Sequence, residues 1–405
     1  MNHIYRLIWN KKRHMLMAVA EVASANGKET VSDAGVRCEV AGTDRGFTGA
    51  RTLLATAVAA LFPILALAQN GGAYDTRHIA ELTRLTLNDG DDSNAQAAGW
   101  HIDNDGELDI SATDAGTSLQ SLSGSGAVLL GERLLTLTNA SPDHVFLGTI
   151  QGSGGLLLAG GIGMLGGLNA YEGATTINGG ASLALSGSGS IALSSGVLNN
   201  GQFDISAADK DVGIRSLSGG SSGSVVLGGR TLVLSAASGH YAGAITGAGG
   251  LTVEGGEEVL SGVNRYTGAT SIGSDGTLAL SGSGAIAMSS GLFNNGVFDI
   301  SASHDGAQVQ NMEGNGAVWL GGKTLTLTNA GGQFDGSIHG SGGLAIAGGY
   351  ATLTGAQHYT GDTTIAQQAV LSLTGQASLA ASREVAVDGA LYFTQPSQDT
   401  RLQSL

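Results

Sequence analysis

Three short motifs in the 405-residue chain have residue types and spacing that could carry chemistry. Gly161-Ile-Gly-Met-Leu-Gly166 matches the Gly-x-Gly-x-x-Gly pattern that cradles the phosphates of a dinucleotide. Gly219-Gly-Ser-Ser-Gly223 matches the Gly-x-Ser-x-Gly turn that presents a serine nucleophile. Asp103-Asn-Asp-Gly-Glu-Leu-Asp109 offers the carboxylates of a calcium loop. Each of these chemistries also needs a particular supporting element, so the surrounding sequence decides among them.

An internal repeat argues against the first two motifs. The positions equivalent to Gly163, 95 residues later and then 93 residues later, are Glu258 and Ala351. No crossover helix is predicted after Gly166, so we interpret this motif as a turn. The Gly-x-Ser-x-Gly match lies in a Gly/Ser-rich turn without the strand–helix setting that a nucleophile requires.

The histidines give no support to a serine-type triad, which needs an orienting imidazole. None of the nine recurs at equivalent positions, since His304 aligns with Asp209 and His358 with Arg265. We expect most of them in exposed turns, and we predict no catalytic residue.

The acidic motif also belongs to the repeat. Asp103-Asn-Asp-Gly106 is equivalent to Leu198-Asn-Asn-Gly201 and to Phe293-Asn-Asn-Gly296. We interpret it as a repeated Asn/Asp-Gly turn, because these residues tolerate left-handed φ, and we expect stacked asparagines to form hydrogen-bonded ladders along the solenoid. No cofactor is predicted, and weak calcium binding near Asp103 and Asp105 stays open as an alternative.

Composition indicates the elements that must hold these residues. The chain contains 68 Gly but only 3 Pro, with 42% apolar and 5% aromatic residues. Collagen is excluded because glycine does not recur at every third position. The apolar content argues against a disordered chain, and the many glycines argue against a helical protein. A net charge of −15 argues against nucleic acid as a partner.

The repeat predicts an all-β solenoid of short parallel strands separated by Gly, Ser and Asn turns. Leu108-Asp-Ile-Ser-Ala112 returns at Phe203 and again at Phe298, each time after 95 residues. With three strands per coil, we expect about four coils of roughly 24 residues in each repeat, about 14 coils in all and a rod of about 65 Å. The alternating pattern places these side chains in the core: Leu183, Leu185, Phe203, Ile205, Leu232, Leu234, Leu278, Leu280, Phe298 and Ile300.

Residues 51–68 have the features of a secretory signal: a basic start, an apolar stretch and the small-x-small end Ala66-Leu67-Ala68. A membrane-spanning helix is disfavoured because the stretch is short and contains Pro63. We expect cleavage after Ala68, which leaves Gln69 as the mature N-terminus. The only cysteine, Cys38, would be removed, and residues 69–405 carry a net charge of −18.

The segment ahead of this signal resembles the extended signal peptide region of Gram-negative exoproteins secreted by the type V route. The resemblance covers the chain from Met1 to Lys28 and rests on the order and spacing of these groups: Met1-Asn2, Ile4-Tyr5-Arg6, Ile8-Trp9-Asn10, Ala18-Val19-Ala20-Glu21 and Gly27-Lys28.

A second resemblance lies in the repeats. Tyr171-Glu-Gly-Ala-Thr-Thr-Ile177, Tyr266-Thr-Gly-Ala-Thr-Ser-Ile272 and Tyr359-Thr-Gly-Asp-Thr-Thr-Ile365 resemble the autotransporter-associated β-strand repeat. The resemblance implies a right-handed parallel β-helix passenger, displayed outside the cell as an adhesin, self-association factor or stalk. That family ends in a membrane-spanning translocator barrel, and no such pattern follows the repeats here.

We therefore expect five segments. They are an extended signal region and linker at 1–50, the hydrophobic signal at 51–68, an N-terminal cap with first coils at 69–100, passenger repeats at 101–380, and a C-terminal end without a barrel at 381–405.

The predicted function is an exported, surface-directed structural or adhesin-like module without catalysis. Its expected partners are the Sec translocon, a translocator barrel that is separate or missing, and a ligand on a host or sibling cell. The expected location is the cell surface, outer membrane or medium if a translocator is available, and otherwise the periplasm. Two alternatives stay open: a secreted β-helical enzyme, such as a polysaccharide lyase or a hydrolase, and a truncated fragment without function.

Overall fold

The computed structural model describes residues 5–10, 15–20, 75–89, 96–396 and 402–404. The chain divides into two compact units, Met1–Leu65 and Ala66–Leu405. In the first unit, β1 (Tyr5–Asn10) and β2 (Met15–Ala20) form an antiparallel pair.

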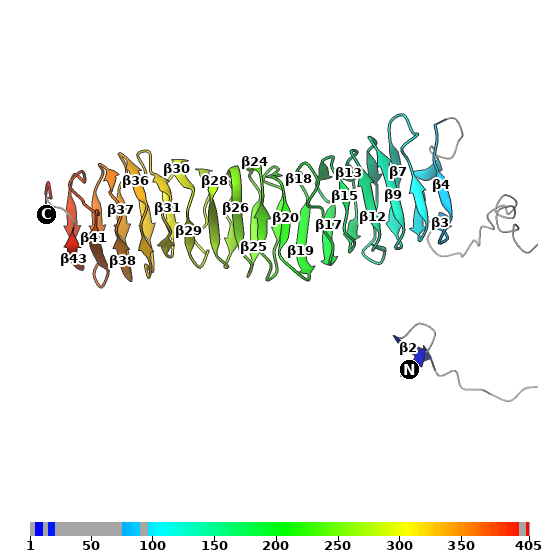
Figure 1. Cartoon of the computed structure of the whole chain (residues 1–405), viewed down its shortest axis with the longest axis horizontal. Helices are drawn as coiled ribbons and strands as arrows, with labels where there is room; N and C mark the ends of the chain where they lie inside the picture. The colour runs from blue at the N-terminus through cyan, green and yellow to red at the C-terminus, as the bar shows by residue number, and fades with distance from the viewer. Residues whose placement is uncertain (1–4, 11–14, 21–74, 90–95, 397–401, 405) are drawn as a thin grey trace, which may run out of the picture. The chain divides into compact units, whose positions relative to one another are not determined.

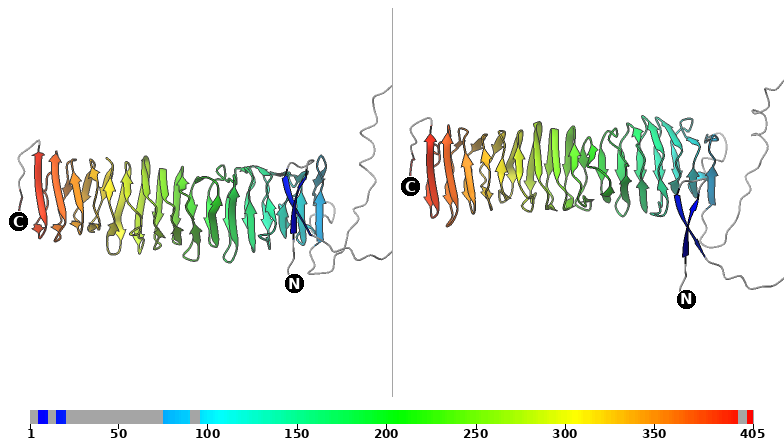
Figure 2. Two further views of the ribbon diagram at one scale, coloured as in Figure 1. Left: turned by 90° about the horizontal axis from the view of Figure 1, so that it is seen from below. Right: turned by 60° about the horizontal axis from the view of Figure 1, so that its bottom comes forward.

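The second unit is a parallel β-solenoid of about 15 coils with essentially no helix in its described residues. Short strands stack in register along the rod, as Figure 1 and both views of Figure 2 show. The predicted all-β solenoid is thereby confirmed, while its right-handed winding stays a prediction. Within the described residues, no helix is long and apolar enough to cross a bilayer.

Each coil passes through three faces in turn, which we name A, B and C. Face A contains β7 (Thr117–Leu119), β10 (Leu135–Leu137), β13 (Leu156–Leu158), β16 (Thr175–Ile177), β18 (Val197–Asn199), β21 (Leu217–Ser218), β24 (Ala237–Tyr241), β30 (Val297–Ser303), β33 (Ala317–Trp319), β36 (Ser337–Gly340) and β39 (His358–Tyr359). Two long strands, β26 (Leu251–Leu260) and β28 (Thr270–Gly282), begin on face C and end on face A.

The other two faces are built in the same way. Face B contains β3 (Asp75–Ile79), β5 (Trp100–Asn104), β8 (Ser121–Ser123), β11 (Val145–Phe146), β14 (Ile162–Leu165), β17 (Ser182–Gly187), β19 (Gln202–Ala208), β22 (Ser224–Val226), β25 (Ala244–Gly247), β27 (Arg265–Tyr266), β31 (Ala307–Val309), β34 (Leu325–Leu327), β37 (Leu344–Ile346), β40 (Thr363–Ile365) and β42 (Val385–Val387). Face C contains β4 (Arg84–Thr86), β6 (Glu107–Asp109), β9 (Ala127–Gly131), β12 (Thr149–Gly152), β15 (Ala170–Tyr171), β20 (Val212–Ile214), β23 (Leu232–Leu234), β29 (Leu292–Asn294), β32 (Met312–Glu313), β35 (Gln333–Phe334), β38 (Tyr350–Leu353), β41 (Val370–Gly375) and β43 (Ala390–Pro396).

The coils are shorter than the sequence predicted. In successive coils of face A, Leu135 pairs with Leu156, Leu156 with Thr175, and Thr175 with Val197. The side-chain hydrogen bonds of Asn169, Thr175 and Ser188 to the neighbouring coil likewise join positions that are 19 to 22 apart in the chain. The expected coil of roughly 24 residues is therefore wrong for the body of the rod. At ~4.8 Å between stacked strands, about 15 coils make a rod of about 70 Å.

This coil length changes the meaning of the 95-residue repeat. Following the stack from Ile177 through Asn199, Gly219, Tyr241 and Leu260 leads to Leu280, which lies five coils further along the rod. The residue one repeat after Ile177 is Ile272, which lies on face C, one face before Leu280. One repeat therefore spans one face less than five coils, or about four and two-thirds coils. Equivalent residues therefore lie on successive faces of the rod, not in line along one face.

The core is a thin apolar column filled by alternate residues of the short strands. The ten side chains predicted to point inward are all fully buried: Leu183, Leu185, Phe203, Ile205, Leu232, Leu234, Leu278, Leu280, Phe298 and Ile300. Each buried aliphatic side chain stabilises the fold by about 1.5–3 kcal/mol. The column runs through every described coil and forms one continuous cluster.

The repeated Tyr-x-Gly-x-Thr motif builds a buried hydrogen-bond cluster. The Tyr171 hydroxyl lies 2.7 Å from Thr175 Oγ1, which lies 2.9 Å from Ser194 Oγ. Ser194 Oγ also contacts the Gly173 carbonyl oxygen at 2.9 Å. The same cluster recurs in the other two repeats: Tyr266 with Thr270 and Ser289, and Tyr359 with Thr363 and Ser382. The motif therefore supplies partners for a buried phenol, which would otherwise cost free energy.

The repeated asparagines act differently from the predicted ladder. Asn104, Asn199 and Asn294 are buried, and each side-chain amide donates a hydrogen bond to a backbone carbonyl of the next coil. Their backbones are not left-handed, because among the described non-glycine residues only Leu82 and Gln368 have positive φ. The ladder prediction is wrong because the three positions lie on different faces, several coils apart.

Candidate functional site

The two sequence motifs for cofactor and nucleophile lie on ordinary parts of the coil. Gly161 turns the chain with φ +74°, and residues 162–165 form β14, so the interpretation of the whole motif as a turn is only partly right. A side chain at Gly161 would come within 2.0 Å of the Ala140 carbonyl oxygen. The turn glycine recurs at Gly256 and Gly349 with φ +77°, so it serves the coil. Gly219-Gly-Ser-Ser-Gly223 forms the turn before β22.

The histidines are placed differently from the prediction of exposed turns. Of the seven histidines in the described residues, five lie within strands. Four of the seven side chains are nevertheless exposed, as predicted: His78, His240, His304 and His358. His101 is buried. Three of the seven gather on face B of the N-terminal coils: His78, His101 and His144.

A chain of hydrogen bonds links two of these histidines to an aspartate. Ser121 Oγ lies 2.8 Å from His101 Nδ1 and 2.9 Å from His144 Nδ1. On the other side of the same ring, His101 Nε2 lies 3.2 Å from Ser123 Oγ, which donates to Asp103 Oδ1 at 2.8 Å. His101 and Ser121 are buried, at 6% and 2% exposure.

The donors in this chain define one protonation pattern. Because Ser123 donates to Asp103, it accepts a hydrogen bond from His101 Nε2–H. A neutral His101 then has a free lone pair on Nδ1, which accepts the Ser121 hydroxyl. Ser121 in turn accepts from His144 Nδ1–H. Each hydroxyl and ring proton in this chain of hydrogen bonds is therefore donated once.

Burial and charge both favour the neutral form of His101. Desolvation lowers its pKa, and the nearby His144 lowers it further, although Asp103 opposes this effect. The rings of His101 and His144 stack with centroids 3.6 Å apart. A positive charge on His101 would be unfavourable beside a second imidazole at that distance, so the stack favours the neutral form of His101.

A hollow lies beside this chain. It has a volume of about 320 Å³ and is lined by Gln120, Ser121 and the loop residues 139–144. The loop contributes Asp143 and His144, so the hollow is polar. Asn139 and Asp143 are the exposed polar side chains that line the hollow, and the buried Ser121 lies at its wall.

A second group of polar side chains lies on the two coils before the hollow. His78, Asp103 and Asp105 bring one ligand atom each within 4.8 Å of one another. Asp103 Oδ1 accepts from Ser123, and Asp105 Oδ1 accepts from the amide and the hydroxyl of Ser125. His78 Nδ1 lies 3.1 Å from Asp103 Oδ2.

The donor atoms of this group would suit some metal ions better than others. Calcium takes six to eight oxygen ligands, and the trio offers two carboxylates and one imidazole nitrogen. If a metal ion bound here, one nitrogen and two carboxylate oxygens would suit Zn²⁺ better than Ca²⁺. Asp103 and Asp105 therefore form part of a mixed group that the sequence did not predict.

The sequence prediction missed these contacts because it assumed the wrong coil length. His101 and Ser121 are 20 positions apart in the chain, and Ser121 and His144 are 23 apart. The structure brings these three residues side by side on one face, and the His101–Ser121 spacing is shorter than the coil predicted from the sequence. The spacing was present in the sequence, but the length of each coil is set by how the chain turns at the corners.

Another row of rings lies on the outer surface of face A near the C-terminus. Trp319 stacks on His339 with centroids 4.7 Å apart, and His339 stacks on His358 at 5.1 Å. These residues are neighbours in the parallel register of β33, β36 and β39. Trp319 stays 46% exposed, so the row offers an aromatic surface to solvent.

Comparison with known proteins bears on the N-terminal region. Residues 1–68 match the family described as the extended signal peptide of the type V secretion system. The chain carries a type V export signal. No curated protein and no solved structure matches the chain.

This signal implies Sec-dependent export across the inner membrane. The signal followed by a β-solenoid body supports an autotransporter passenger. The predicted cleavage residues Ala66, Ala68 and Gln69 lie outside the described residues, so cleavage after Ala68 stays a prediction.

Proposed function

We propose that this protein is a surface-displayed passenger that works as a structural or adhesive rod without catalysis. The observation that carries the proposal is the type V export signal directly ahead of a long β-solenoid. A solenoid offers extended faces for contact, and its stability comes from neighbouring coils. Its ligand would lie on a host or sibling cell.

Charge and surface chemistry support this role. Residues 69–405 carry a net charge of −18, which keeps a long rod soluble and away from anionic membranes. The exposed Trp319, stacked on His339 and His358, supplies an aromatic contact surface of the kind enriched at binding sites.

The test is localisation of the full chain in a Gram-negative host, with and without a co-expressed type V translocator barrel. We expect a mature N-terminus at Gln69 and, with the barrel, loss of the rod when intact cells are treated with protease. A matched control lacks residues 1–68 and should stay in the cytoplasm. Rod that stays protected in the periplasm under both conditions would contradict surface display.

A secreted hydrolase is the second candidate, and one observation favours it. Ser121 Oγ lies 2.8 Å from His101 Nδ1 at the edge of the 320 Å³ hollow, so the imidazole could accept the hydroxyl proton. A fluorophosphonate probe tests this directly. Labelling that is abolished by Ser121→Ala and kept in Ser221→Ala would favour the hydrolase, and absence of labelling in the unmodified chain would count against it.

A further inference from the structure

Glu258 is a carboxyl group inside the apolar column. Its side chain is fully buried, and neither carboxyl oxygen has a hydrogen-bond partner. It lies in β26, where the parallel register places it between Gly239 of the preceding coil and Leu278 of the following coil. Figure 1 shows β26 near the middle of the rod.

The surrounding coil leaves room for this side chain. A Cβ atom built at Gly239 would lie 1.8 Å from the Leu217 carbonyl oxygen and 2.9 Å from Glu258 Oε2, so the glycine allows close packing of the coils and also leaves space for the carboxyl group. The equivalent of Glu258 in the first repeat is Gly163, where a Cβ atom would come within 2.7 Å of the Leu158 side chain. The second repeat has the smaller Val253 in place of Leu158.

The third repeat supplies the other comparison. Its residue at this position is Ala351, which is buried and apolar like the column around it. The fold therefore accepts Gly or Ala here, and only the second repeat places an acid in the core.

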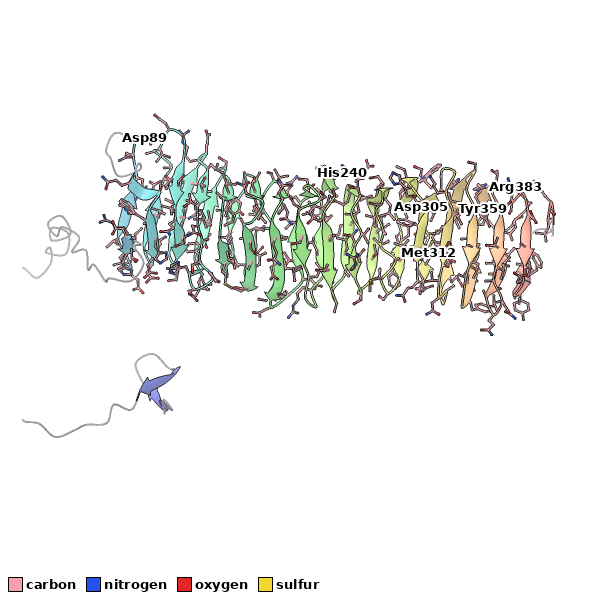
Figure 3. The ribbon with its side chains drawn as sticks, turned by 180° about the vertical axis from the view of Figure 1, so that it is seen from behind. Asp89, His240, Asp305, Met312, Tyr359 and Arg383 are labelled. Atoms are coloured by element: carbon pink, nitrogen blue, oxygen red, sulfur yellow. The ribbon has the colours of Figure 1, made fainter. Side chains whose placement is uncertain are left out.

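Among the described residues of β24, β26 and β28, no charged side chain is buried beside Glu258. Four charged or titratable side chains on β26 and its two neighbouring strands are exposed: Glu254, Glu257, His240 and Asp275. The remaining titratable group on these strands, the phenol of Tyr241, is buried. His240 lies at the edge of the rod in Figure 3. Desolvation raises the pKa of Glu258 to about 8. The backbone amides of Leu217 and Gly239 lie near the carboxyl group without hydrogen-bond geometry, and they offset only part of this rise.

We propose that Glu258 is a proton-controlled weak point in the middle of the rod, at which loss of the proton opens the adjoining coils. As a neutral carboxylic acid, the side chain is tolerated in its slot. As a carboxylate, it is a buried charge without a partner, which the fold accommodates only by exposing it to water. The affected region is the stack of β24, β26 and β28.

The effect should stay local because each coil of a solenoid contacts only its neighbours. Opening near Glu258 removes contacts from the coils on either side and leaves distant coils packed. The equivalent coils around Gly163 and Ala351 have no buried acid at this position and serve as internal references.

The direction of the pH effect follows from linkage. Glutamate in an unfolded chain has its ordinary pKa near 4.5, whereas folded Glu258 holds its proton to about pH 8. Between these values the folded state binds the extra proton, so raising the pH favours opening. The opening equilibrium should rise by up to tenfold per pH unit in this window and become constant above it.

Hydrogen exchange of the full chain between pH 5 and pH 9, corrected for the intrinsic rate, tests the proposal. We expect protection of residues 251–282 to fall with rising pH, while protection of residues 156–187 and 344–375 stays constant. Equal pH dependence in all three segments, or none in 251–282, would overturn the proposal.

Two variants separate the carboxyl group from its surroundings. Glu258→Gln removes the charge and keeps the shape, so its segment should lose the pH dependence. Glu257→Gln, at the exposed neighbour, should behave like the unmodified chain. If Glu258→Gln fails to fold, Glu258→Ala introduces the residue of the third repeat and should give the same flat profile. Persistence of the pH dependence in either folded Glu258 variant would contradict the proposal.

Discussion

The N-terminal coils around His101 and the central coils around Glu258 both hold a buried ionisable side chain, but they treat it in different ways. His101 has hydrogen-bond partners on both ring nitrogens, whereas Glu258 has none on either oxygen. Desolvation is the largest influence in both cases, and it lowers the pKa of His101 while it raises that of Glu258. Burial favours the neutral form of each group.

This difference gives the two regions opposite responses to pH. Neutral His101 contributes stability above its ordinary pKa near 6.5, and that stability is lost as the pH falls through its lower folded value. Neutral Glu258 contributes stability at low pH, and that stability is lost as the pH rises toward 8. Acid should therefore weaken the first coils and base should weaken the middle of the rod.

The largest effect is expected from a second buried acid, placed where the column holds an isoleucine. Ile205→Asp should destabilise its coil by about 3–5 kcal/mol, because Ile205 is fully buried and a carboxylate there has no partner. Denaturant unfolding at pH 8 measures the loss, and Gln202→Asp, at the outer surface of the same strand, is the control. An unchanged midpoint for Ile205→Asp would mean that Ile205 does not face the core.

Removing a hydrogen-bond partner from the buried Tyr266 hydroxyl should destabilise the fold less than Ile205→Asp does. Thr270→Val leaves the Tyr266 hydroxyl and Ser289 without their shared contact and should cost about 1–3 kcal/mol. Thr252→Val, on the same face at a partly exposed position, should change stability by less than about 0.5 kcal/mol. Equal losses in the two variants would show that the buried cluster contributes nothing specific.

The acid response of the N-terminal coils should be smaller than the alkaline response at Glu258. His101→Gln removes the group that must stay neutral, so loss of protection at residues 100–123 below pH 6.5 should become weaker. Hydrogen exchange between pH 4 and pH 7 measures it. His240→Gln, at an exposed histidine, should leave the profile unchanged, and an acid response that persists in His101→Gln would assign it to other groups.

The smallest effect is expected where charges are exposed. Arg383 donates from Nε to Asp362 Oδ1 at 2.8 Å, and both side chains contact solvent. Arg383→Ala should therefore leave the unfolding midpoint unchanged, because an exposed ion pair contributes little. A clear shift of the midpoint would show that the contribution of a charged group to stability does not depend mainly on its burial.

The fold was largely predictable from the sequence, because short alternating strands and frequent glycines favour stacked coils. The inward positions such as Leu183 and Phe203 followed from that alternation, which has a period of two residues in any strand. Coil length was not predictable, because the number of residues at each corner depends on how strands stack. The candidate site was missed partly for that reason: His101 and Ser121 meet across a coil of 20 residues, which is shorter than predicted.

The sequence by itself determined the export signal, the strand pattern and the repeat, since all three can be recognised from the order of residues along the chain. Tertiary structure decided which residues meet between coils. A repeat of 95 residues is not a whole number of coils, so Tyr171, Tyr266 and Tyr359 lie on three faces although their motifs are equivalent. For the same reason, the buried position of Glu258 and the contacts of His101 follow from stacking, which acts between residues one coil apart and leaves no local signature in the sequence.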